Sequence, residues 1–141
     1  MPRPIPAATL RRLATTARRA AKLAYAPYSR FPVGAAILTE SGIYAGCNVE
    51  NASYGLCNCA ERTAIFSAVA AGRRQLRAVV VYTPTQTPTL PCGACRQVIN
   101  EFGPEAAVIS LCDGPSHLST GAADLLPHSF GPHSLAAARR R

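Results

Sequence analysis

The sequence predicts a layered α/β fold, in which helices cover a sheet of buried strands. Residues 9–25 carry apolar side chains at helical spacing. Residues 78–81 and 107–111 are instead continuous apolar runs, which are typical of strands covered on both faces. A length of 141 residues suits one domain, so we expect a single domain over residues 1–141.

The first part of the chain predicts one helix followed by a hairpin. The helix should extend from about Thr9 to Tyr25, because Pro27 lies just beyond this stretch. Two segments rich in strand formers, Val33–Leu38 and Ile43–Val49, flank the turn sequence Thr39–Gly42.

The rest of the chain predicts two more helices that alternate with two more strands. The first of these helices is small or apolar around its whole circumference, which predicts a helix buried within the protein and ending at Gly72. A proline-rich loop precedes the second helix. The expected elements are the helix Cys59–Ala71, the strand Arg77–Tyr82, the loop Thr83–Pro91, the helix Cys92–Phe102, the strand Ala107–Leu111 and a short helix or turn from Leu125.

The formal net charge of +8 raises the question of a nucleic-acid partner. Much of the excess has a simpler explanation, because it lies on one side of the first helix and in a basic tail, expected to be disordered, from about residue 134. The chain also has no Trp and no basic stripe with interleaved aromatic side chains for stacking bases. We therefore expect no nucleic-acid partner.

The chain carries no sign of a membrane or of secretion. No apolar run approaches the roughly 20 residues that span a bilayer. The start of the chain has Pro2, Pro4 and Pro6 where a secretory signal would have an apolar core. The six cysteines show no disulfide spacing, and reduced thiols fit a cytoplasmic protein.

Two short segments carry the chemistry, Cys59–Arg62 and Pro91–Arg96. Together they offer the thiols of Cys59, Cys92 and Cys95 and the carboxylate of Glu61. Three protein ligands leave the fourth position of a tetrahedral zinc open to water, whereas a structural zinc site closes with a fourth residue. Cys92 and Cys95 are three residues apart, so both sulfurs can face one point at the start of a helix, where thiolates are favoured.

Other interpretations of the cysteines are a redox dithiol and half of a structural zinc knuckle. A knuckle needs a second ligand pair, but Cys57 and Cys59 have the wrong spacing, and all three histidines lie far downstream. A redox site would not need Glu61. The pattern of a Cys or His followed by x-Glu and later by Pro-Cys-x-x-Cys is instead that of zinc deaminases, in which the Glu moves protons without binding the metal.

Further motifs extend this pattern over almost the whole chain. They are Arg30–Ala36, the run Asn48–Gly55 that leads into Cys59–Ala64, and Leu125–Pro127 with Phe130. On these motifs the sequence resembles the cytidine deaminase family, in its small form with three cysteine ligands. The resemblance implies a three-layer α/β/α fold with a mixed central sheet of about five strands, the fifth near residues 112–123, where the sequence itself gives only turn signals.

The resemblance also implies a function and a set of site residues. The function would be hydrolytic deamination of cytidine and deoxycytidine in pyrimidine salvage, with one Zn²⁺ per chain and Glu61 shuttling protons. Arg62 would hydrogen-bond the ligand sulfurs and offset their charge. The substrate contacts would be Phe31, Asn48, Glu50, Ala52, Tyr54, Ala60 and Phe130.

These assignments have competing interpretations. Phe31 and Phe130 could be ordinary core residues, and Asn48 and Glu50 could cap a loop backbone. The resemblance implies that Ala52 and Tyr54 reach a neighbouring subunit's site and that the small form is a homotetramer. If Phe130 completes a neighbour's pocket in the same way, the active unit must be an oligomer. The apolar helix Cys59–Ala71 suits the centre of such an assembly, although a buried core helix in a monomer would look the same.

Three rival functions remain. One is deamination of another aminopyrimidine nucleoside, such as blasticidin S, which the run Asn48–Tyr54 disfavours because it resembles the cytidine enzymes as a block. The second is editing of a polynucleotide, for which this short chain has no insertion that could build an open groove. The third is a basic zinc-binding module for RNA, which would leave Glu61 without a role.

Overall fold

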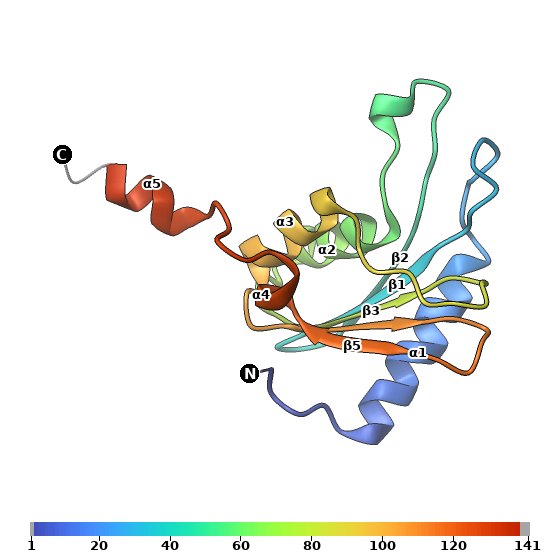
Figure 1. Cartoon of the computed structure of the whole chain (residues 1–141), viewed down its shortest axis with the longest axis horizontal. Coiled ribbons are helices and arrows are strands. Elements are labelled where there is room, and N and C mark those ends of the chain that lie inside the picture. The colour runs from blue at the N-terminus through green and yellow to red at the C-terminus, as the bar shows by residue number, and fades with distance from the viewer. Residues whose placement is uncertain (1, 139–141) are drawn as a thin grey trace.

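A single mixed sheet of five strands forms the centre of the protein (Figure 1). The computed structural model describes residues 2–138. The strand order is β2-β1-β3-β4-β5, in which β3 and β4 are parallel and every other pair is antiparallel. The strands are β1 (Gly34–Thr39), β2 (Ile43–Cys47), β3 (Leu76–Tyr82), β4 (Ala107–Leu111) and β5 (Leu118–Gly121).

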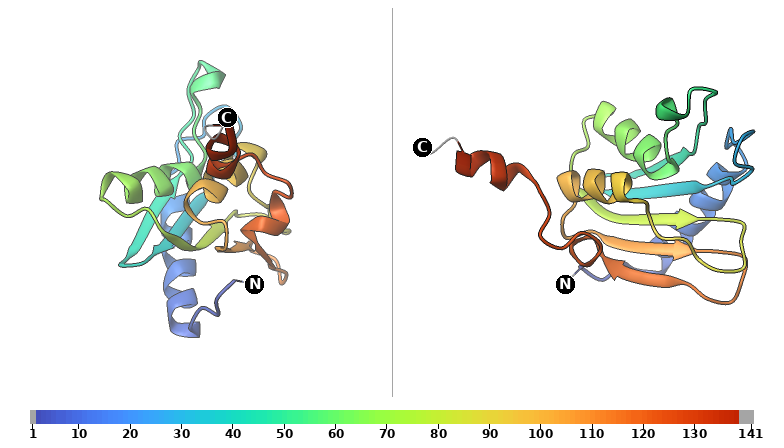
Figure 2. Two further views of the ribbon diagram at one scale, coloured as in Figure 1. Left: turned by 90° about the vertical axis from the view of Figure 1, so that its left-hand side faces the viewer. Right: turned by 45° about the horizontal axis from the view of Figure 1, so that its top comes forward.

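Helices cover both faces of this sheet, which confirms the predicted three-layer α/β/α architecture (Figure 2). One face packs against α1 (Ala7–Ala21), and the other packs against α2 (Ala60–Ala70) and α3 (Gly93–Phe102). Successive residues of a strand point to opposite faces of the sheet, so alternate residues pack into the hydrophobic cores on its two sides. Val79 and Val81 pack beneath α2 and α3, whereas Ala78 and Val80 pack against α1.

The predicted boundaries hold within a few residues for most elements. The fifth strand of the resemblance is present as β5 (Leu118–Gly121), and residues 112–117 before it form an irregular loop with bends at 113–115. Gly72 ends the helical region as expected, with a φ of 80° that favours glycine. The first helix is the largest difference, because α1 stops at Ala21 and the chain then turns toward the cavity described below.

One expectation about α2 needs correction for the single chain. Its inner residues are buried, including Ala64, Ile65 and Ala68, but Phe66 on the outer side is 48% exposed. An alanine-rich sequence does not reveal which side of a helix is covered, because small residues suit either environment. In the isolated chain, α2 therefore lies on the sheet with one bare face.

The C-terminal segment also differs from its prediction. A short helix α4 (Ala122–Leu125) is followed by a segment that leads into α5 (Pro132–Ala138), which extends away from the body of the protein (Figure 1). The basic tail expected to be disordered from about residue 134 is therefore helical as far as Ala138. Proline at the first helical position and the alanines that follow explain the helix. Arg139, Arg140 and Arg141 lie outside the described residues.

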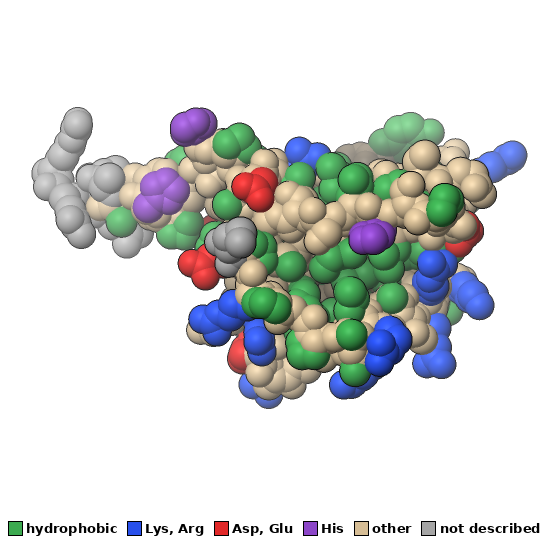
Figure 3. Space-filling view, turned by 60° about the horizontal axis from the view of Figure 1, so that its bottom comes forward, with side chains coloured by type: hydrophobic (Ala, Val, Ile, Leu, Met, Phe, Trp, Pro, Cys, Tyr) green, Lys and Arg blue, Asp and Glu red, His purple; other side chains and the backbone are tan. Residues whose placement is uncertain are grey.

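The basic side chains of α1 lie on its outer face, with Arg11, Arg12 and Arg19 exposed. Viewed from below, Lys and Arg side chains lie around the margin of the molecule and do not form one continuous patch (Figure 3). Arg18 has a specific contact, because it donates to Asp113 at 3.1 Å and stacks on the Tyr82 ring at 4.3 Å. Within residues 2–138, no helix has the length and apolar character that crossing a bilayer requires.

Two glycines allow the helices to lie close to the sheet. At Gly34 a Cβ atom would meet the backbone of Ala17 in α1, and at Gly46 it would meet the backbone of Ala60 and Ala64 in α2. The contact at Gly46 positions the start of α2, because Ala60 begins the helix that carries Glu61. The close position of α2 over β2 therefore requires that residue 46 has no side chain.

We expect the substitution Gly46→Ala to lower the free energy of unfolding by about 1–3 kcal/mol, since α2 must move away from β2 to admit the methyl group. Urea denaturation measures this change. Gly55→Ala is the matched control, because a Cβ there would have no neighbour within 4 Å, and its effect should stay within about 0.5 kcal/mol. Equal stability of the two variants would contradict the role assigned to Gly46.

Candidate metal and active site

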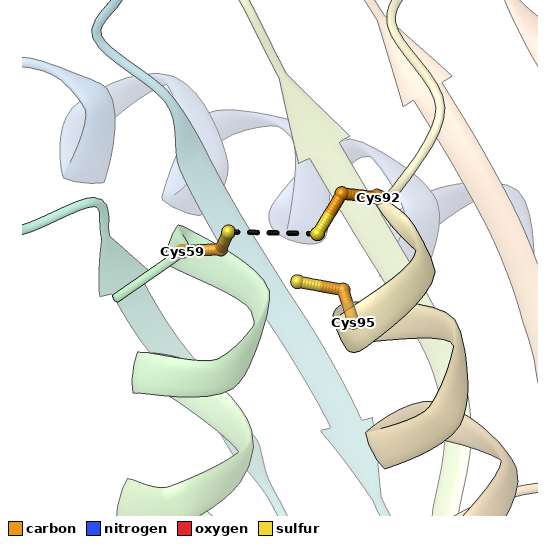
Figure 4. Close-up of side chains that lie close together, drawn as sticks. All are labelled: Cys59, Cys92 and Cys95. Carbon is orange, nitrogen blue, oxygen red and sulfur yellow. Dashed lines mark hydrogen bonds between the residues drawn. The ribbon is translucent and has the colours of Figure 1, made fainter. Parts of the chain in front are cut away.

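Two helices begin side by side over the sheet, and each brings a cysteine to its first residues. Cys59 is the N-cap of α2, Cys92 is the N-cap of α3, and Cys95 lies one turn further along α3. The three sulfur atoms lie within 4.8 Å of one another and point toward a common centre (Figure 4). Helix N-termini favour negative charge, so this arrangement stabilises thiolates.

The geometry of these sulfurs fits a zinc ion. The Sγ atoms of Cys59 and Cys92 are 3.7 Å apart. A tetrahedral zinc with Zn–S bonds of 2.3 Å places its sulfur ligands about 3.8 Å apart. Thiolate ligands also select zinc over magnesium or calcium, which prefer oxygen. Cys59, Cys92 and Cys95 can therefore hold one zinc ion per chain.

Arg62 lies against the sulfur cluster. Its Nη2 donates to Cys59 Sγ at 3.3 Å, and this hydrogen bond raises the pKa of the guanidinium further above its usual range. Hydrogen bonds from Cys95 and Arg62 lower the pKa of Cys59 from 9.0 to about 5, whereas the bond to Cys59 raises the pKa of Cys95. Negative charge in the cluster is therefore favoured on Cys59, the sulfur that Arg62 contacts.

Glu61 is buried beside the sulfurs, with only 4% of its surface exposed. Burial raises the pKa of its carboxyl group above the usual range, and the negative charge of Cys59 raises it further. Desolvation favours the neutral acid, so this carboxyl group accepts a proton more readily than a surface glutamate does. A group of this kind can act first as a base and then as an acid.

A cavity of about 460 Å³ opens in front of the sulfurs and Glu61. Its volume is within the range of small-molecule sites. Of the seven predicted substrate contacts, four line it: Phe31, Asn48, Glu50 and Ala60. Cys59, Cys92, Glu61 and Arg62 line the same cavity, so chemistry and binding groups share one space.

Asn48 and Glu50 already have partners in the chain. Asn48 accepts a hydrogen bond from Val33 N and donates one to Phe31 O, both at 2.8 Å. Glu50 Oε1 accepts from the backbone N–H groups of Tyr28 and Ser29 at 2.9 and 3.1 Å, and the bonds to Ser29 and Tyr28 lower its pKa. The competing interpretation, in which both side chains cap a loop, is therefore correct for this structure. Both nevertheless keep unused hydrogen-bonding capacity and face the cavity.

Three predicted contacts do not line this cavity within residues 2–138: Ala52, Tyr54 and Phe130. Ala52 is exposed, and Tyr54 and Phe130 are 73% and 62% exposed. Tyr54 packs edge-on against Tyr28, with the two ring centroids 5.7 Å apart. The structure of one chain thus brings four of the seven predicted contacts together and leaves three on its surface.

Other residues of the cavity wall were not predicted. They are Ser29, Val33, Cys57, Asn58, Val81, Thr83, Thr89 and Leu90. Val81 lies near the end of β3 and Thr83 directly follows this strand, where the sequence looks like ordinary core. Thr89 and Leu90 could have been suspected, because their loop delivers Cys92 to its helix. Asn58 donates to Thr63 at 3.1 Å and so stabilises the start of α2.

Zinc content tests the ligand set directly. Purified protein should contain about one zinc per chain, and Cys95→Ser should contain less than about a tenth of this, because a serine hydroxyl is a poor zinc ligand. Cys57→Ser is the matched control, since the Cys57 thiol bonds to the backbone of Asn51 and lies outside the sulfur cluster. Loss of zinc from both variants, measured by elemental analysis, would contradict the assignment.

Comparison with known proteins agrees with this geometry. The family model described as the cytidine and deoxycytidylate deaminase zinc-binding region matches residues 8–111. A cytidine deaminase of Sporosarcina psychrophila is 47% identical over 126 residues, which cover 88% of this chain and 93% of that protein. A cytidine deaminase of Mycobacterium tuberculosis is 42% identical over 125 residues, covering 88% and 91% of the two chains.

Solved structures give the same result for the fold. The 1.6 Å crystal structure of a cytidine deaminase from Burkholderia pseudomallei superposes with a TM-score of 0.81 at 52% identity, covering 85% of this chain and 98% of that one. The region that the family model matches, residues 8–111, includes both helices that carry the sulfur ligands. The chain therefore belongs to the cytidine and deoxycytidylate deaminase family.

Proposed function

We propose that this protein is a cytidine deaminase, which hydrolyses cytidine and deoxycytidine to uridine and deoxyuridine and releases ammonia in pyrimidine salvage. The observation that carries this proposal is a buried carboxyl group, Glu61, next to a three-sulfur zinc site in the wall of one cavity. Three ligands leave a coordination position free for the reaction. The relatives with this activity match almost the full length of the chain.

In the proposed mechanism Glu61 carries protons between the reactants. A zinc ion held by Cys59, Cys92 and Cys95 would supply an electrophilic centre that lowers the pKa of water toward neutrality. Glu61 takes a proton from the attacking water and delivers it to N3 of the pyrimidine while the new C4–O bond forms. It then takes the proton of the new C4 hydroxyl group and passes it to the amino group as the C4–N bond breaks, so that the C4 carbonyl forms and ammonia leaves. The high pKa of a buried carboxyl group suits both transfers.

Arg62 keeps the site able to react. Three thiolates donate so much negative charge that they oppose the acidification of water at the metal. The hydrogen bond from Arg62 to Cys59 withdraws part of this charge and also fixes the sulfur in place. Arg62 is thus proposed to act on the metal through a ligand, without touching the nucleoside.

The nucleoside is proposed to bind between Phe31 and the polar groups at the cavity mouth. Asn48 and Glu50 can donate to and accept from the two sugar hydroxyls with the capacity that their backbone contacts leave free. Phe31, which is 38% exposed beside the cavity, offers an aromatic wall. Ala60 begins α2 in the cavity wall, close to the reacting end of the base.

The remaining proposed contacts come from other subunits of a homotetramer in the cytoplasm. Ala52, Tyr54 and Phe130 lie on the surface of one chain, outside its own cavity. The exposed Phe66 on α2 adds apolar surface that a partner could cover. This bare apolar surface supports an assembly in which neighbouring chains complete one another's sites.

Ultraviolet absorbance tests the reaction, since the cytosine band is lost on deamination. Wild-type protein should convert cytidine and deoxycytidine, and Glu61→Gln should lose at least about 1000-fold in kcat while still binding zinc, because the amide cannot shuttle protons. Glu101→Gln on the exposed side of α3 is the matched control and should keep full activity. Conversion of blasticidin S alone would move the assignment to that substrate class, and RNA binding without turnover would reject an enzyme.

Mixing two defective variants tests the shared site. Phe130→Ala should raise KM, and Glu61→Gln supplies chains that keep Phe130 but lack turnover. If Phe130 acts in a neighbour's pocket, unfolding and refolding the two variants together should restore sites that have both residues, with KM returning toward the wild-type value. Mixtures that behave as the sum of their components would show that the sites are not shared.

A further inference from the structure

The helix that carries two zinc ligands also holds the C-terminal segment, through three side chains on one of its faces. Gln97 Nε2 donates to the backbone oxygen of Phe130 at 2.9 Å. Arg96 Nη1 donates to the backbone oxygen of Leu125 at 3.2 Å, and Ser129 Oγ donates to Asn100 Oδ1 at 3.3 Å. In Figure 1 the chain leaves α4 and passes α3 before α5 extends outward.

Arg96 connects this contact to the zinc site itself. Its Nε donates to the backbone oxygen of Pro91 at 2.7 Å, and Pro91 immediately precedes the ligand Cys92. One half-buried guanidinium therefore bonds the ligand loop on one side and the end of α4 on the other. Because a guanidinium is planar and rigid, these two bonds fix the two segments relative to each other.

Phe130 combines an anchored backbone with a bare side chain. Its carbonyl group is held by Gln97, yet 62% of the residue is exposed. His128, two residues earlier, has a φ of 54°, so the chain bends sharply on its way to this position. The backbone of Phe130 is therefore held in place while its ring stays free to contact another molecule.

We propose that Gln97 is a positioning residue, which with Arg96 sets Phe130 at a fixed place relative to Cys92 and Cys95 so that the ring can complete a nucleoside site in a neighbouring chain. The inference rests on the proposed function, in which Phe130 contacts substrate. It adds that α3 has two tasks, because the same rigid helix holds the metal ligands of its own site and supports the wall of another.

A stabilising role alone makes a different prediction. If Gln97 only strengthened the fold, its loss would lower the thermal midpoint and leave KM unchanged. If Gln97 acts through Phe130, its loss should raise KM with little change in kcat, because it weakens substrate binding and leaves the reacting groups in place. The effect should also vanish once Phe130 itself is removed.

The first experiment is a double-mutant cycle with cytidine. Gln97→Ala should raise KM about five- to tenfold, with kcat within about twofold of wild type. Gln97→Glu, which keeps the length but cannot donate, should do the same, and Gln75→Ala, at an exposed glutamine outside the cavity, should have no effect. Gln97→Ala combined with Phe130→Ala should have the KM of Phe130→Ala alone. The inference would be overturned if the KM of the double variant rose by the product of the two single effects, or if both Gln97 variants failed to yield folded protein.

A mixing experiment gives an independent test. When Gln97→Ala is refolded together with Glu61→Gln, each restored site takes Glu61 from one chain and a correctly held Phe130 from the other, so KM should return toward the wild-type value. A residue that acted on its own chain's zinc ligands would not be rescued in this way. Rescue of Phe130→Ala but not of Gln97→Ala would therefore overturn the proposal.

These outcomes remain separate from the proposed function. Absence of cytidine turnover by the wild-type protein would reject the function itself. Turnover by the wild type, with KM unchanged in Phe130→Ala, would leave the function intact and overturn the inference, since Gln97 would then have no functional ring to position.

Discussion

Three sulfur atoms and one carboxyl group gather negative charge where two helices begin, and the rest of the site depends on how this charge is balanced. The positive ends of α2 and α3 supply part of the balance, and Arg62 supplies another part through Cys59. A zinc ion completes it. Since the sulfurs come from two separate helices, the charge can be balanced only if the sheet places both helix ends together.

Close packing provides this placement. Small residues dominate the contact between α2 and the sheet, and Gly46 removes the last side chain that would separate them. On the opposite face Gly34 does the same for α1. Rigid secondary structure therefore positions Cys59, Glu61 and Arg62, and only the outer rim of the cavity depends on loops. Catalytic groups on rigid elements keep their geometry better than groups on loops do.

The sequence predicted more of the chemistry than of the binding wall. That Cys59, Cys92, Cys95 and Glu61 lie together could be predicted, because metal chemistry restricts both residue type and spacing. Thr83 and Val81 were missed because residues at the end of a buried strand look like core whether or not a cavity opens beside them. The exposed face of α2 was missed for a related reason. Alanine occurs on both buried and exposed faces of helices, so an alanine-rich sequence does not indicate which face is covered. The helix at Pro132–Ala138 was hidden by the basic residues that follow it.

Asn48 and Glu50 each have two roles, and this limits which substitutions the protein could accept during evolution. Both side chains hold the loop that carries Phe31, and both face the space where a sugar would lie. A mutation that alters the preference for one sugar over another would at the same time release the backbone around it. In the proposed binding mode, sugar selectivity and loop order are therefore inherited together, and a new selectivity would be more accessible at Thr89 in the surrounding wall than through these two residues.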